Sequence, residues 1–64
     1  MRHSELWDRM DHHLGTAYSK AWAADQVLRE LGGRTVFQAL EDGEPPKLVW
    51  RAVWAALELP AAER

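Results

Sequence analysis

Apolar residues recur along this chain at helical spacing, and capping and stop residues divide the pattern into four segments. Nowhere do apolar and polar residues alternate with a period of two over the length of a strand, so we predict no strand. The pattern predicts an all-α fold, a compact bundle of four short helices in a single domain over residues 1–64. The expected helices are about residues 5–14, 17–31, 36–42 and 46–58.

Capping residues mark where these helices begin and end. Ser4 is a good N-cap for the first helix. Gly32 ends the second helix, because a residue without a Cβ can take the left-handed conformation at a helix C-terminus. Thr35 and Gln38 fit a capping box, in which each side chain binds a free backbone amide of the other. Pro46 suits the first turn of the fourth helix, where a backbone amide has no partner.

The apolar faces of the first and third helices predict part of the core. The stripe on the first helix consists of Leu6, Trp7, Met10 and Leu14. The third helix is expected to offer three residues to the core: Val36, Phe37 and Leu40.

One carboxylate, Asp25, falls within the apolar arc of the second helix. A buried carboxylate is costly unless it is hydrogen-bonded or paired with a cation. We therefore predict a structural polar clasp around Asp25. The candidate partners are Arg29, Arg34, Arg51 and the free amides near Thr35. The alternative is that the end of the helix leaves Asp25 in water.

The fourth helix carries apolar residues on two opposite sides. Its main stripe is Val49, Trp50, Val53 and Leu57, with Trp54 at one margin. The second stripe is Leu48, Ala52, Ala55 and Leu59. A helix that is apolar almost all round is normally buried, so this helix either lies at the centre of the bundle or meets another molecule. In the second case we expect Leu48, Ala52, Trp54, Ala55 and Leu59 to bind a protein partner or a second copy of the chain.

Composition indicates that stability must come from packing. The chain has 64 residues, four tryptophans and no cysteine. A core of this size is small, and each tryptophan can bury roughly 150–250 Å². Without cysteine, neither disulfides nor thiolate metal sites can contribute.

Charge and hydropathy narrow the class of partner. The net charge is -2 and no basic run of five or more occurs, which disfavours nucleic acid. The first residues lack the apolar stretch of a signal peptide, and no run of about 18 apolar residues occurs. We expect a soluble cytoplasmic protein with no membrane contact.

Two features suggest chemistry, and each has a structural alternative that we favour. The run from Leu31 to Val36, "LGGRTV", is preceded by a predicted helix and lacks the spacing and lysine of a phosphate-binding loop, so a carboxylate of the same chain is the expected partner of Arg34. Asp8 and His12 stand four residues apart on one helix face, but further metal ligands are missing. Because no nucleophile and base stand at an informative spacing, we expect no enzyme, no cofactor and no metal site.

The chain resembles a family of small actinobacterial proteins of unknown function, DUF3046, over essentially its whole length. The residues that carry the resemblance are Trp7, Met10, His13, Gly15, Tyr18, Trp22, Asp25, Val27, Leu28, the run 31–36, Ala39, Leu40, Gly43 and the run 49–53, "VWRAV". The resemblance implies a compact all-helical fold, a location near recombination genes in many genomes and no established enzymatic activity.

Two positions depart from that family's pattern. Many relatives carry a cysteine where this chain has Trp54, so thiol-based redox sensing cannot operate here. Pro45 replaces the acidic residue that usually precedes the last helix, so the cap of that helix is not predicted.

These observations favour a non-catalytic protein-interaction module. The family resemblance alone implies a place for it as a small regulator in stress or DNA-repair physiology. The alternative is a weak DNA-binding protein with a helix-turn-helix-like arrangement, using Arg34, Lys47 and Arg51. The outward positions of the fourth helix are mostly alanine and leucine, which are poor readers of base edges.

Overall fold

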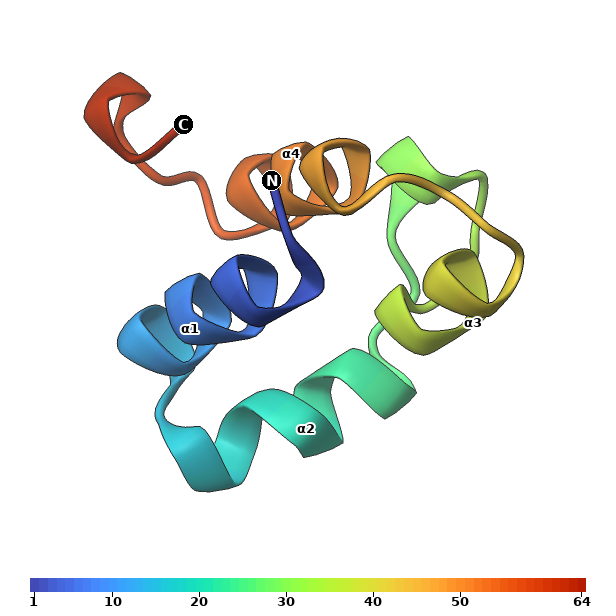
Figure 1. Ribbon diagram of the computed structural model, residues 1–64, viewed down its shortest axis with the longest axis horizontal. Coiled ribbons are helices and arrows are strands. Elements are labelled where there is room, and N and C mark those ends of the chain that lie inside the picture. The colour runs from blue at the N-terminus through green and yellow to red at the C-terminus, as the bar shows by residue number, and fades with distance from the viewer.

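The computed structural model describes residues 1–64 and consists of four α-helices and two short 3₁₀ turns around one core (Figure 1). The elements are α1 (His3–Leu14), α2 (Thr16–Asp25), η1 (Arg29–Leu31), α3 (Val36–Glu41), α4 (Pro46–Ala56) and η2 (Ala61–Glu63). No strand is present, and the all-α prediction is confirmed. In Figure 1 the four α-helices follow one another around the core, so that α4 returns to lie beside α1.

Local capping chemistry places two helix starts where the sequence predicts them. The amide of Gln38 donates to Thr35 Oγ1 at 3.1 Å, and the amide of Thr35 donates to Gln38 Oε1 at 2.9 Å. These reciprocal bonds form the predicted capping box of α3. Pro46 is the first residue of α4, also as predicted.

The predicted N-cap of α1 is wrong by two residues. Arg2 occupies the N-cap position, and Ser4 lies within the first helical turn. The amide of Arg2 donates to Glu5 Oε1 at 3.4 Å. Because Glu5 stands three residues after Arg2, its side chain serves the amide that an N-cap leaves free, and the helix starts earlier.

The second helix ends at Asp25, six residues before the predicted end at residue 31. Residues 28–34 instead form a closed turn, in which the amide of Leu28 donates to the carbonyl of Arg34 at 3.0 Å. Gly32 and Gly33 have φ values of 68° and 81°, which lets the chain reverse within this turn. The turn buries Leu28 and Leu31, so tertiary packing replaces the helix that local pattern predicts.

The fourth helix, α4, does not lie at the centre of the bundle as one alternative from its two apolar sides predicted, but is one of four helices arranged around the core. The helix contacts α1, η1 and α3, and α2 covers the remaining side of the core against α1 and α3. Trp50 of α4 is the largest fully buried side chain. The core residues are Leu6, Met10, Ala23, Leu28, Leu31, Val36, Ala39, Val49, Trp50, Ala52 and Val53.

The fourth helix, α4, ends at Ala56, two residues before its predicted end at residue 58. Glu58, just beyond this end, has a left-handed conformation. The amide of Leu59 donates to the carbonyl of Trp54 at 3.1 Å, and the amide of Glu58 donates to the carbonyl of Ala55 at 3.2 Å. This is the Schellman arrangement, which usually has glycine at the left-handed position. Glu58 has a φ of 54° and is the only non-glycine residue with a positive φ. It turns the chain so that residues 60–64, here called the 60–64 segment, return to α1 and α4.

Candidate interaction surfaces

Arg34 joins the turn at 28–34 to the connection between α3 and α4. Its Nε donates to the carbonyl of Leu31 at 2.7 Å, its Nη1 to Asp42 Oδ2 at 3.1 Å and its Nη2 to Glu44 Oε2 at 2.6 Å. The hydrogen bond to Glu44, followed by the one to Asp42, raises the pKa of Arg34 above its ordinary value. The expected carboxylate partner of Arg34 is therefore found within the chain, and "LGGRTV" is a structural turn.

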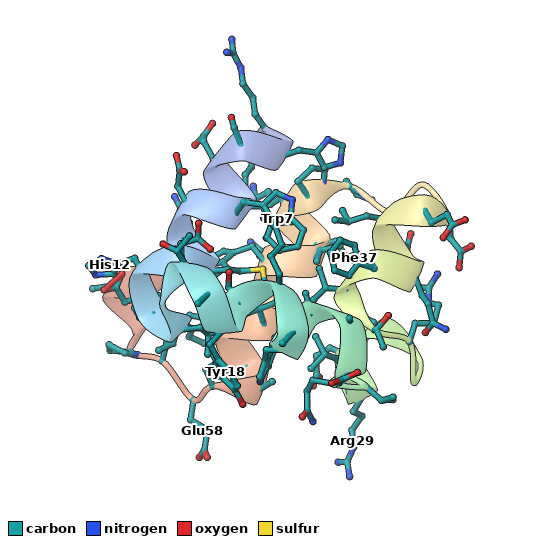
Figure 2. All side chains as sticks on the ribbon, turned by 90° about the horizontal axis from the view of Figure 1, so that it is seen from below. Trp7, His12, Tyr18, Arg29, Phe37 and Glu58 are labelled. Atoms are coloured by element: carbon teal, nitrogen blue, oxygen red, sulfur yellow. The ribbon has the colours of Figure 1, made fainter.

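The polar clasp predicted around Asp25 is not formed. Asp25 is exposed at the last residue of α2 and makes no ion pair. Arg29 and Arg51 are also exposed and unpaired, and Arg29 points away from the body of the molecule (Figure 2). The prediction failed because it extended α2 over residues that turn away, whereas the clasp that does form uses Arg34 with other carboxylates.

The second stripe of α4 is divided between core, margin and surface. Ala52 is 2% exposed and belongs to the core, so its prediction as a partner-binding residue is wrong. Trp54, Ala55 and Leu59 are half-buried. Leu48 is 43% exposed and is the one member of the predicted set that stands open at the surface. The five residues therefore do not make one continuous open face.

A shallow cavity lies beside Leu48 at the start of α4. Its volume is about 350 Å³, and its lining residues are Pro45, Lys47, Leu48 and Arg51. Lys47 and Arg51 stand one helical turn apart on the same helix and make no ion pair. This cavity thus combines an exposed leucine with two free cations, in a chain whose net charge is -2.

A second cavity, which is lined mostly by polar residues, lies between α1 and the 60–64 segment. Its volume is about 290 Å³, and it is lined by Asp8, Arg9, His12, His13, Ala62, Glu63 and Arg64. Among these residues, His13 Nε2 lies 3.8 Å from Glu63 Oε2. Within the chain no group of three or more His, Cys, Asp or Glu residues is placed to hold a metal ion, so the pair Asp8 and His12 acquires no further ligand.

The 60–64 segment is bound to α4 by two tryptophan indoles. The Nε1–H of Trp50 donates to the carbonyls of Glu63 at 3.0 Å and Arg64 at 3.1 Å, and the Nε1–H of Trp54 donates to the carbonyl of Pro60 at 2.9 Å. Arg9 of α1 adds a bond to the Arg64 carbonyl at 3.3 Å. The hydrophobic pattern of the sequence could not predict these contacts, because the spacing between the bonded residues follows neither a helical nor a strand period.

An aromatic pair links α1 to α3 at the surface. The rings of Trp7 and Phe37 have centroids 5.3 Å apart, and Figure 2 shows the two side chains directed toward one another. The ammonium of Lys20 from α2 lies 4.8 Å from the Trp7 ring. Phe37 is 41% exposed, so the prediction that it enters the core is wrong.

The sequence model of a family described as "Protein of unknown function (DUF3046)" matches residues 1–62. The chain belongs to this family. No curated protein and no solved structure matches this DUF3046 protein. None of its helices has both the length and the apolar character needed to cross a membrane.

The two runs that resemble the DUF3046 family have structural roles in this member. The run 31–36 supplies the glycines of the turn, Arg34 of the ion-pair cluster and the cap of α3. The run 49–53 is the part of α4 that enters the core, with Arg51 as its exposed member. Neither run by itself marks a site of chemistry, whereas Lys47 and Leu48 lie just before the second of them.

Proposed function

We propose that this DUF3046 protein is a non-catalytic interaction module that binds an acidic segment of a partner protein at the start of α4. The observation that carries the proposal is the exposure of Leu48 between two free cations, Lys47 and Arg51. An exposed leucine of this kind is commonplace alone, but a leucine beside a concave cationic rim fits a partner that offers both an apolar side chain and carboxylates.

Charge complementarity favours an acidic occupant over a neutral or basic one. Arg34 has two carboxylate partners, but Lys47 and Arg51 have none. A partner carboxylate near these cations would gain attraction without displacing an existing ion pair. Rim charges of this kind mainly raise the association rate and select the partner, while Leu48 supplies the apolar contact.

The same observation weakens the alternative of DNA binding. That proposal needs Arg34, Lys47 and Arg51 together, yet the guanidinium of Arg34 is directed to Asp42 and Glu44. Two remaining cations would neutralise too few phosphates for useful affinity. A gel-shift titration of duplex DNA at low salt tests this alternative, and a complex that weakens steeply with added salt would restore it.

Only the family resemblance supports a regulatory role in stress or DNA-repair physiology. Binding at the start of α4 would suit such a role, because the surface is formed by residues that the core does not require. The identity of the partner is therefore the first thing to measure.

Affinity capture from the native cell lysate, with the unmodified chain and three matched variants as baits, tests the interaction proposal. The unmodified chain is compared with Leu48→Glu, with the double variant Lys47→Glu and Arg51→Glu, and with the control Val27→Glu. Val27 is an exposed aliphatic residue, 54% exposed, outside the cavity at the start of α4. We expect a protein that is captured by the unmodified chain and the control but lost with both α4 variants.

A photo-reactive residue at position 48 then locates the contact on the captured protein. The proposal predicts a crosslink within an acidic stretch of that protein, and a yield that falls as salt is raised. Capture that is equal with all baits, or a crosslink from position 27 and none from position 48, would reject this surface.

A further inference from the structure

The 60–64 segment is held mainly through its backbone. The indoles of Trp50 and Trp54 and the guanidinium of Arg9 all donate to backbone carbonyls of the segment. Most of the segment's side chains remain exposed, namely Pro60, Ala61, Ala62 and Arg64. The donor groups on α1 and α4 therefore bind mainly the carbonyls of the segment, and the Arg64 guanidinium adds a side-chain contact 5.3 Å from the centroid of the Trp54 ring. The same segment of another copy would make these contacts equally well.

The hinge that brings the segment back is strained at one residue. Glu58 carries a Cβ in the left-handed region, where L-residues are crowded and glycine is usual. In the right-handed conformation Glu58 would extend α4 and direct the segment away from its own α1. The extension would stop there, because Leu59 precedes Pro60 and the residue before a proline disfavours the helical region. The hinge thus has an open conformation that relieves the strain.

Opening would leave an incomplete surface. Trp50 is 1% exposed, and in the closed state its indole N–H has two carbonyl acceptors from the segment. Removing the segment uncovers part of a large aromatic side chain and leaves the indole donors of Trp50 and Trp54 without protein acceptors. Refilling the site with the same backbone groups restores every one of these contacts.

We propose that two copies of this chain exchange their 60–64 segments, each segment docking on α1 and α4 of the other copy. A reciprocal exchange forms a closed twofold dimer and leaves no site empty. Closed monomer and dimer make the same contacts between segment and receptor, so the hinge strain and the cost of association decide between them. The exchange does not involve the cavity beside Leu48, so it is tested independently of the proposed partner binding.

Substitutions at Glu58 test the hinge directly. Glu58→Gly accepts the positive φ and favours the closed monomer, whereas Glu58→Ala keeps the crowding and strengthens the helical alternative. We expect sedimentation equilibrium up to about 1 mM chain, the range of effective concentration for a short linker, to detect a dimer. The dimerisation constant of Glu58→Ala should exceed that of Glu58→Gly by at least about tenfold.

The exchange itself is observed by mixing isotope-labelled and unlabelled copies of Glu58→Ala. Isotope-filtered nuclear Overhauser spectra should then connect the indole Hε1 of Trp54 in one copy to protons of Pro60 in the other. Three results would each overturn the proposal. They are a Glu58→Ala chain that stays monomeric to about 1 mM, equal dimerisation constants for the two variants, and a dimer in which this contact is only intramolecular.

Discussion

The ring of Trp7 in α1 lies 5.3 Å from the ring of Phe37 in α3, with 38° between their planes. The two helices are separated in sequence by α2, so this contact ties distant parts of the chain together at the surface. Tilted aromatic pairs at this separation contribute about 0.5–1.5 kcal/mol beyond the area that they bury.

A double-mutant cycle should measure that coupling. We expect Trp7→Leu and Phe37→Leu to lower the free energy of unfolding, and the combined variant to lose about 0.5–1.5 kcal/mol less than the sum of the two. Urea denaturation of the four chains gives the values. The control cycle combines Trp7→Leu with Tyr18→Leu and should show additivity, because Tyr18 is an exposed ring with no aromatic partner. Equal coupling in both cycles would contradict a specific contact.

The buried hydroxyl of Ser19 provides a second tie, between α1 and α2. Ser19 is fully buried, and its Oγ donates to the carboxylate of Asp11. Ser19→Ala should lower the free energy of unfolding by about 1–3 kcal/mol, because it leaves a half-buried carboxylate without its donor. Ser4→Ala is the matched control, since Ser4 is exposed and should change stability by less than about 0.5 kcal/mol. A loss for Ser19→Ala no larger than for this control would show that Asp11 is fully served by water.

The pH dependence of Arg34 follows from the direction of its pKa. Hydrogen bonds to Glu44 and Asp42 raise the pKa of Arg34 in the folded chain. A raised pKa contributes stability that is fully present below the unfolded pKa and is lost only as the pH rises through the folded one. For arginine that window lies above about pH 12. Arg34→Gln should therefore lower the melting temperature by the same amount at about pH 6 and about pH 9.

Thermal unfolding of Arg34→Gln and the unmodified chain at both pH values measures this difference. Arg29→Gln is the control, because Arg29 is exposed and makes no ion pair. A difference for Arg34→Gln that shrinks markedly at pH 9 would mean that another group with an ordinary titration range controls the cluster.

Local signals predicted the parts of this fold that local chemistry determines. The capping box of Thr35 and Gln38 and the proline start of α4 need only residues three or four apart, and both are found. The end of α2 depends instead on the pairing of Leu28 with Arg34 across a turn, which helical periodicity does not describe. The predicted helix therefore continued through residues that in fact fold back.

The candidate sites show the same division. Arg34 was expected to find a carboxylate, but its partners lie eight and ten residues further along the chain and could not be identified from helix faces. The contacts of Trp50 and Trp54 with the 60–64 segment depend on the left-handed turn at Glu58. This turn could not be predicted from the sequence, because the position is not occupied by glycine. Periodicity showed that α4 has two apolar sides, but it could not tell which residues neighbouring elements cover.

Leu48 and Ala52 occupy the same predicted stripe and should respond in opposite ways to a charge. Ala52→Glu places a carboxylate in a core site that is 2% exposed, with no cation within the core to receive it. A cost of several kcal/mol is expected, which is a large part of the total stability of a domain this small. Leu48→Glu places the same charge at a site that is 43% exposed, beside Lys47 and Arg51, and should change the free energy of unfolding by less than about 0.5 kcal/mol.

Urea denaturation of both variants, monitored by circular dichroism, separates stability from binding at this surface. A folded, stable Leu48→Glu chain is required for its loss of partner capture to report on contact rather than on unfolding. If Leu48→Glu proved as damaging as Ala52→Glu, Leu48 would be supporting the core from its edge, and the surface at the start of α4 would lose its apolar anchor.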